Sequence, residues 1–341
     1  MTTDTMSAFI ATTTPVLSAA RRIWMFMHVS PDLDAVGAHA GALAWVRQCN
    51  PTAPVCIGGG DYPRANLLAI AAAVDPHVFQ HIDPADVAFC EGDVVVLIDV
   101  ADIMRTSHRN DWALPAGIPR IVIDHHVVQC DAPYQLIDAS YQSASALVYD
   151  LMQQAHTPLT QAHMACLVMG VLGDSGFFRF LDRRLVHTLA LVQSFCERYG
   201  VDAYYQLVDL LERNRPAADF VIQGAYLHNL VVRPRYAYTT LTLAEVAALD
   251  LPAEALNGVN GASLIRNIAD TEFVFVVKEH QPGMYRSSWR TCAGAVTSVR
   301  AIVAPHGGGG HDSAAGYSFA AESMAAAVAH LEACIALQGA P

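Results

Sequence analysis

The chain has 341 residues, 53% of them hydrophobic, and carries a formal net charge of −12 at pH 7. This length exceeds that of one typical domain and suits two, each able to bury a core of its own. The acidic balance argues against sequence-independent binding of long nucleic acid, because such binding depends on Lys and Arg neutralising many phosphates. A short or small anionic ligand, held by local groups, is compatible with this charge.

The cysteines and the apolar runs bear on the compartment. None of the eight cysteines forms a CxxC pair, and scattered thiols in a large apolar chain are typical of a reducing compartment. No run reaches the roughly 18 apolar residues of a membrane span, and no basic segment precedes an apolar one at the N-terminus. The sequence therefore predicts a soluble cytoplasmic protein without a membrane partner.

The first strong pattern is the apolar run 23–27, which predicts a buried strand. His28 follows the run directly, and Asp32 and Asp34 come after a Ser-Pro turn. A helical pattern then extends over 35–49, and we expect Asp34 to cap this helix. One imidazole and two carboxylates thus converge where a strand ends and a helix begins, which is where ligands bind in an open α/β sheet.

Two further apolar runs end on residues of the same types. They are 94–98, followed by Asp99, and 121–123, followed by Asp124, His125 and His126. A fourth candidate, Asp174, lies between two glycines after a predicted helix over 160–172. One aspartate after a strand is commonly a helix cap or a turn residue, but three strands that end this way favour a site for a divalent metal ion.

The other elements before residue 217 continue the alternation of strand and helix. They are helices over 7–20 (interrupted near its Thr-Thr-Thr-Pro stretch), 65–73 and 143–155, strands over 54–57 and 134–137, and a region helical throughout from 183 to about 213. Gly58-Gly59-Gly60 is interpreted as a turn, because no P-loop Lys-Ser/Thr follows it. The pattern predicts an α/β domain over 1–190, with a mostly parallel sheet flanked by helices, and a helical linker over 191–216.

Past residue 217 the pattern predicts a smaller α+β domain over 217–341. Its predicted strands are 227–232, 236–243, 272–279 and 284–290, and its predicted helices are 244–249, 294–304 and 322–337. The segment 306–316, HGGGGHDSAAG, either brings backbone amides close to an anion, with His311 as a donor, or forms a flexible loop. Arg286, on a predicted strand, is either a phosphate ligand or a solvated residue.

Five of these motifs occur in the order found in a known superfamily. HVSPDLD, LIDVAD, IDHH and GDSGFF resemble the motifs of the DHH phosphoesterases, and GGGGHDSAAG resembles the glycine-rich motif of the DHH-associated C-terminal domain. The motifs extend from about residue 28 to 316. The length and two-domain plan are similar to those of the oligoribonuclease and pAp-phosphatase subgroup.

The resemblance implies a site for two divalent ions, Mn²⁺ or alternatively Mg²⁺, that activate water for in-line attack on phosphorus. Imidazole among carboxylates favours manganese. By resemblance, Asp99 bridges the ions, His126 contacts the phosphate and Asp124 orients a histidine. The implied ligands are His28, Asp32 and Asp99 for one ion, and Asp34, Asp99, His125 and Asp174 for the other.

For the second domain the resemblance implies capture of a terminal phosphate or nucleotide. The implied residues are Arg286, Ser287, Gly308, Gly309, Gly310 and His311. The implied activity is hydrolysis of short oligoribonucleotides to mononucleotides, and of pAp to AMP. The alternatives are hydrolysis of linear or cyclic dinucleotides (pApA, cyclic-di-AMP) and a catalytically silent nucleotide-binding module. A homodimer is left open.

Overall fold

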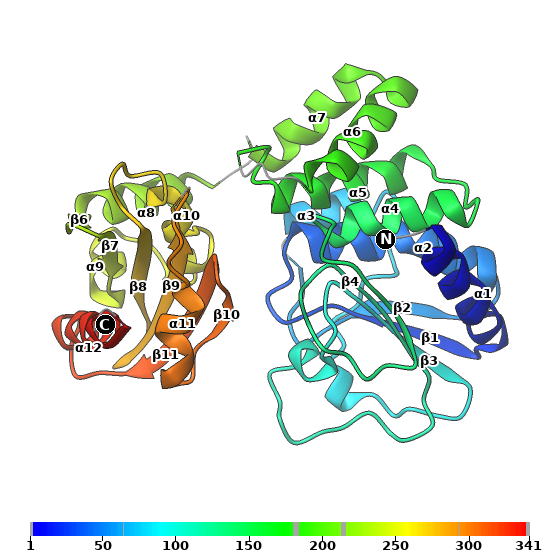
Figure 1. Ribbon diagram of the computed structural model, residues 1–341, viewed down its shortest axis with the longest axis horizontal. Helices are drawn as coiled ribbons and strands as arrows, with labels where there is room; N and C mark the ends of the chain where they lie inside the picture. Colours follow the sequence, from blue (N-terminus) through cyan, green and yellow to red (C-terminus); the bar gives the residue numbers. More distant parts are fainter. Residues whose placement is uncertain (1–2, 64, 180–183, 213–215, 293, 339–341) are drawn as a thin grey trace. The chain divides into compact units, whose positions relative to one another are not determined.

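The computed structural model describes residues 3–63, 65–179, 184–212, 216–292 and 294–338 (Figure 1). The chain divides into two compact units, Met1–Asn214 and Arg215–Pro341. Each unit contains a sheet with hydrophobic clusters on both faces. Among the described residues, no helix is both long enough and apolar enough to cross a membrane.

The first unit contains a five-stranded sheet in the order β2-β1-β3-β4-β5, and every neighbouring pair is parallel. Its strands are β1 Arg22–Phe26, β2 Val55–Gly58, β3 Asp93–Ile98, β4 Arg120–Asp124 and β5 Tyr134–Ile137. β3 is buried along its whole length, as expected for an unbroken apolar run in a parallel sheet. The predicted mostly parallel sheet is confirmed.

Helices cover one face of this sheet and loops cover the other. The helices of the unit include α1 Thr3–Ala19, α2 Leu33–Cys49, α3 Ala65–Ala71, α4 Ala144–Gln154, α5 Gln161–Asp174, α6 Leu185–Tyr199 and α7 Val201–Glu212. Met25 and Ile121 belong to the cluster shared with these helices, whereas Phe26 and Val122 pack against loop residues such as Trp112. Figure 1 shows α2, α4 and α5 together on the helix side.

Two helical predictions for this unit need correction. α1 continues through Pro15 and is not interrupted at the Thr-Thr-Thr-Pro stretch. The predicted continuous helix over 183–213 is two helices, because the chain breaks at Gly200, whose φ of +87° suits glycine. Residue 183 of that prediction, and residues 213–215 of the predicted linker, lie outside the described residues.

The second unit contains a six-stranded mixed sheet in the order β10-β11-β9-β8-β7-β6. Its strands are β6 Val231–Val232, β7 Tyr236–Leu241, β8 Phe273–Gln281, β9 Met284–Thr291, β10 Gly309–His311 and β11 Ala314–Ala320. Its helices include α8 Ala217–His228, α9 Leu243–Ala248, α10 Gly261–Ile265, α11 Val299–Val303 and α12 Met324–Gln338. One sheet face packs on α11 and α12, and residues of α8, α9 and α10 pack on the other. The predicted α+β class is confirmed.

Three segments of the second unit differ from expectation, one of which is the predicted helix 294–304, helical only from Val299. Most of the predicted strand 227–232 is the end of α8 and a turn, and only β6 is extended. Part of the glycine-rich segment is a strand rather than a flexible loop, since β10 pairs antiparallel with β11. Glycine has low strand propensity, so this strand depends on its partner rather than on its own residues.

Candidate metal centre

The carboxyl ends of β1, β3 and β4 are neighbours in the sheet of the first unit, because β3 lies between the other two. His28 lies two residues past the end of β1, Asp99 follows β3, and His125 follows β4. Parallel strands end at one edge of a sheet, so residues far apart in sequence meet there.

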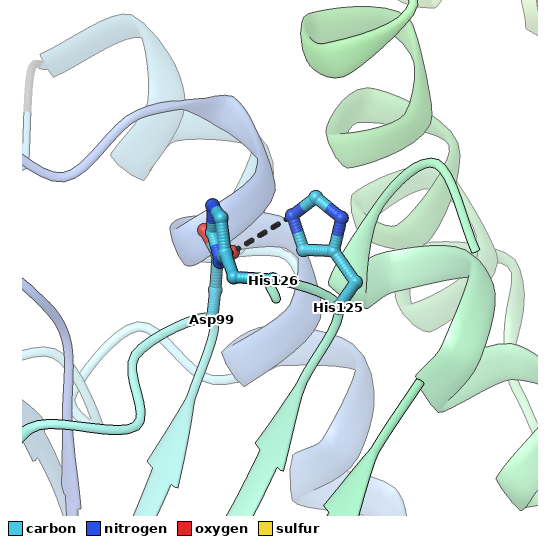
Figure 2. Close-up of side chains that lie close together, drawn as sticks. All are labelled: Asp99, His125 and His126. Carbon is cyan, nitrogen blue, oxygen red and sulfur yellow. Dashed lines mark ion pairs between the residues drawn. The ribbon is translucent and has the colours of Figure 1, made fainter. Parts of the chain in front are cut away.

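Asp99 lies at the middle of this group. Its Oδ1 is 3.2 Å from His125 Nε2 and 3.7 Å from His126 Nδ1, and Figure 2 shows the three side chains together. Its Oδ2 is 3.6 Å from His28 Nε2. Asp99 is buried and has a φ of +62°. Aspartate adopts this left-handed region more readily than most residues, and the turn leaves its carboxylate among three imidazoles.

Two more aspartates complete the group. His125 Nε2 is 3.4 Å from Asp174 Oδ2 and 3.9 Å from Asp34 Oδ2. The expected cap of α2 by Asp34 is wrong, because Asp32 occupies that position and its Oδ1 accepts from the amides of Asp34 and Ala35. Asp32 also lies 3.9 Å from His28 Nε2.

The carboxylate of Asp34 is instead directed at the N-terminus of α4. It accepts hydrogen bonds from the backbone amides of Ala144, at 2.6 Å, and Ser145, at 2.9 Å. The positive end of a helix dipole favours a carboxylate at this position. The start of α4 therefore orients Asp34, a role that no sequence motif pointed to.

Glycines allow α2 and α5 to cross at close range beneath the centre. A Cβ at Gly37 would lie 2.3 Å from the carbonyl oxygen of Cys166. A Cβ at Gly170 would lie 1.9 Å from Ser145 Oγ and 2.7 Å from Asp34 Oδ1. Real Cβ atoms do not approach so closely, so a methyl group at Gly37 would meet backbone atoms, and one at Gly170 would displace the side chains of Ser145 and Asp34. These helix glycines were missed, although a glycine inside a helix is itself a signal of close packing.

The crowding of carboxylates and imidazoles shifts the pKa values of the site residues. Burial, and next the charge of Asp99, raise the pKa of Asp34 to about 7. Burial opposes protonation of His125, but contacts with Asp99 and the charge of Asp174 outweigh it and raise the pKa to about 10. The pKa of His28 is raised to about 9, against burial, by Asp99 and Asp32. Crowded carboxylates produce this pattern.

The donor set fits divalent cations. Three groups have ligand atoms within 4.8 Å of one another: His28, Asp32 and Asp99; Asp34, His125 and Asp174; and Asp99, His125 and His126. Ligand atoms about 2.1 Å from one ion lie about 3 Å apart at neighbouring positions and about 4.2 Å apart at opposite ones. The distances above fall in or near this range. Asp99 Oδ1 is buried and makes no hydrogen bond in the described part of the chain, as suits a cation ligand.

Asp124 lies beside the centre. Its Oδ1 accepts from the backbone amide of His126 at 3.0 Å and lies 2.7 Å from His126 Nδ1. Asp124 is buried, whereas the His126 ring is partly exposed. This contact fixes the ring orientation of His126 and directs Nδ1 toward the carboxylates.

In the second unit, the polar residues of β9 alternate between the two sheet faces. Arg286, Ser288 and Arg290 share one face, and this face is exposed at Arg286 and half-buried at the other two. Burial, and next the charge of Arg266, lower the pKa of Arg290. No carboxylate in the described ranges forms an ion pair with Arg290, and two guanidinium groups close together favour an anion. Arg290 was missed because its neighbours carry no glycine or acidic motif.

Ser287, another residue predicted to capture substrate, is not on the β9 face that carries Arg286. Ser287 lies buried on the opposite face, donating to Tyr317 O at 3.2 Å and accepting from Trp289 Nε1 at 2.8 Å, so it does not share a face with Arg286. The period of two in a strand reverses the face at each residue.

The glycine run has a structural explanation within the hairpin. A Cβ at Gly308 would lie 2.9 Å from Gly316 O, and one at Gly310 2.4 Å from Ala314 O. Gly309 has open space around it. His311 pairs with β11 through its backbone, and its side chain is outside what the structure describes.

A parallel α/β unit with imidazoles and carboxylates at the ends of three strands has the side chains that a metal centre requires. Residues 22–171 match the DHH family, N-terminal domain. The first unit therefore carries a DHH-family N-terminal domain.

Relatives extend the likeness to the second unit. The chain is 26% identical over 308 residues to a probable bifunctional oligoribonuclease and PAP phosphatase NrnA of Streptococcus mutans, covering 88% of this chain and 90% of that one. A bifunctional oligoribonuclease and PAP phosphatase NrnA of Bacillus subtilis is 27% identical over 165 residues, 46% of this chain and 47% of that one. An exopolyphosphatase-related protein of Bacteroides fragilis has the same fold, with a TM-score of 0.82 and 20% identity over 97% of this chain and 96% of that one.

Proposed function

We propose that the chain is a Mn²⁺-dependent phosphoesterase that hydrolyses short oligoribonucleotides to mononucleotides and pAp to AMP. The proposal rests on one observation. Three sets of His and Asp side chains have their ligand atoms close together, and two of these sets share Asp99. The likeness to oligoribonuclease and PAP phosphatases over most of the chain supports the substrate class.

The proposed ion ligands are His28, Asp32 and Asp99 for one ion, and Asp34, Asp99, His125 and Asp174 for the other. Divalent ions held there supply positive charge to the phosphate and lower the pKa of water. Asp99 faces both sets of ligands, so its two oxygens fix their spacing. Asp124 holds His126 with its ring at the partly exposed side of the centre, where a phosphate oxygen can accept from it.

Substrate capture is proposed for the face of β9 that carries Arg286 and Arg290. A guanidinium group donates two parallel hydrogen bonds to a phosphate, which gives direction as well as affinity. The acidic first unit and the cationic face of the second then have separate tasks. The proposed task of the first unit is to bind the ions, and that of the β9 face is to bind an anionic group.

The test is turnover of the purified chain with Mn²⁺ or Mg²⁺ on a panel of pAp, pApA, cyclic-di-AMP and RNA dimers to pentamers. We expect mononucleotides from the RNA oligomers, phosphate from pAp, and loss of both activities in a chelator. Hydrolysis confined to the dinucleotides would assign the chain to the dinucleotide phosphodiesterases. Nucleotide binding without hydrolysis of any member would indicate a silent binding module.

A further inference from the structure

The loop between His28 and Asp32 adopts a backbone conformation that its sequence does not favour. Ser30 has a φ of +56°, a region that residues other than glycine, asparagine and aspartate seldom occupy. Pro31 follows it, and a residue before proline prefers extended backbone. Something outside the loop must therefore hold Ser30 in place.

The carboxylate of Asp61, in the loop after β2, supplies that contact. Asp61 Oδ2 accepts from the backbone amide of Ser30 at 2.6 Å and from Ser30 Oγ at 3.3 Å. The same oxygen lies 2.9 Å from His108 Nε2. Just before the loop that carries Asp61, Met27 N donates to the carbonyl oxygen of Gly58, the last residue of β2, at 2.8 Å.

We propose that Asp61 is a positioning residue of the metal centre, which holds Ser30 in its left-handed conformation and thereby sets the spacing of His28 and Asp32. This inference rests on the metal-binding function proposed above. Asp32 is anchored on one side by its cap of α2, and His28 by the end of β1. Between them, Val29 N donates to Arg105 O at 2.8 Å, and Asp61 supplies the contact at Ser30, where the backbone is left-handed.

His108 supports the contact from the far side. Its ring is more exposed than the Asp61 carboxylate, with 61% against 36% of the side chain accessible. It touches neither His28 nor Asp32 within the described contacts, so it acts on the loop only through Asp61. Its removal should have a smaller effect than removal of Asp61.

The experiment measures Mn²⁺ binding by calorimetry to four forms of the full chain: wild type, Asp61→Ala, Ser30→Gly, and the double variant. We expect Asp61→Ala to weaken binding by about tenfold, as loss of a group that orients metal ligands does. Ser30→Gly in the Asp61→Ala background should restore most of the affinity, because glycine adopts positive φ without an external contact. A role of Asp61 in general stability predicts no such rescue.

Asp61→Asn distinguishes a positioning role of Asp61 from electrostatic attraction of the metal ion by its carboxylate. The same variant tests the proposal if Asp61→Ala does not fold. Asparagine keeps an oxygen that accepts from the Ser30 amide, so near wild-type affinity is expected. The matched control is Asp75→Ala, which removes another surface carboxylate that accepts a backbone amide. Asp75 pairs with Arg47 in the last turn of α2, about 20 Å along that helix from Asp34.

Three results would overturn the inference while leaving the proposed function intact. They are unchanged binding in Asp61→Ala, a double variant as weak as Asp61→Ala alone, and loss in Asp61→Asn as large as in Asp61→Ala. Absence of Mn²⁺ binding by the wild type would overturn both the inference and the proposed function.

Discussion

The two units of the chain bring charged side chains together in different ways. In the first, His28, Asp99 and His125 come from the ends of three strands and meet because parallel strands end at one edge. In the second, Arg286 and Arg290 come from one strand and share a face because every second residue does. A centre built from many segments depends on the whole fold, whereas a face built from one strand depends on register alone.

This difference predicts different responses to mutation. Removing one ligand from a crowded centre changes the charge felt by every other member, so the loss should be large and shared. Removing one cation from a strand face should weaken binding by the contribution of that side chain. The variants below test this contrast.

Asp99→Asn should have the largest effect. The amide keeps the shape of the side chain and tolerates the φ of +62°, but it removes the charge that faces both groups of ligands. We expect turnover to fall at least about a thousandfold and Mn²⁺ content, measured by elemental analysis of the purified protein, to fall below one ion per chain. Retention of two ions would refute the central place of Asp99.

Arg290→Met should have an intermediate effect, confined to the substrate. Loss of a charged hydrogen bond is expected to raise KM for a nucleotide substrate about ten- to a hundredfold, with kcat little changed. Steady-state kinetics and metal analysis check this together. Arg300→Met, an exposed cation of α11 outside the β9 face, is the control and should leave KM unchanged. Loss of metal in Arg290→Met would contradict the separation of tasks between the units.

Gly170→Ala should have the smallest effect of the three. Its Cβ would meet Ser145 Oγ and Asp34 Oδ1, so one ligand must shift. We expect about tenfold weaker Mn²⁺ binding and a loss of about 1–3 kcal/mol in the free energy of unfolding.

The control for Gly170→Ala is Gly224→Ala in α8, where nothing lies within 4 Å of the added methyl group. It should raise the free energy of unfolding by about 0.5–1 kcal/mol and leave metal binding unchanged. Calorimetry and thermal unfolding of both variants measure the contrast. If Gly170→Ala and Gly224→Ala had the same Mn²⁺ affinity and the same free energy of unfolding, Asp34 would have room to move.

The sequence predicts the parallel sheet and the clustering of the candidate metal ligands at its edge, because the sequence patterns that indicate them are local. An unbroken apolar run marks a buried strand, and a His or Asp directly after it marks the ligand edge. The left-handed conformations of Ser30 and Asp99 could not be predicted in this way, since they depend on contacts from other loops.

The sequence is least informative where a distant partner decides the outcome. Asp32 and Asp34 are equally good caps by residue type, and the choice follows from the start of α4, some 110 residues away along the chain. Ser287 and Ser288 differ by one position, and only the strand register assigns them to faces. The glycine segment becomes a strand only because β11 pairs with it.

The close crossing of α2 and α5 has a consequence for engineering. Replacing a helical glycine with alanine is a standard way to make a protein more heat-resistant. At Gly37 that substitution would push α2 away from the backbone of α5, and at Gly170 it would displace the side chains of Ser145 and Asp34. A thermostable version of this enzyme should therefore take its added methyl groups from helices elsewhere, and leave this pair of glycines untouched.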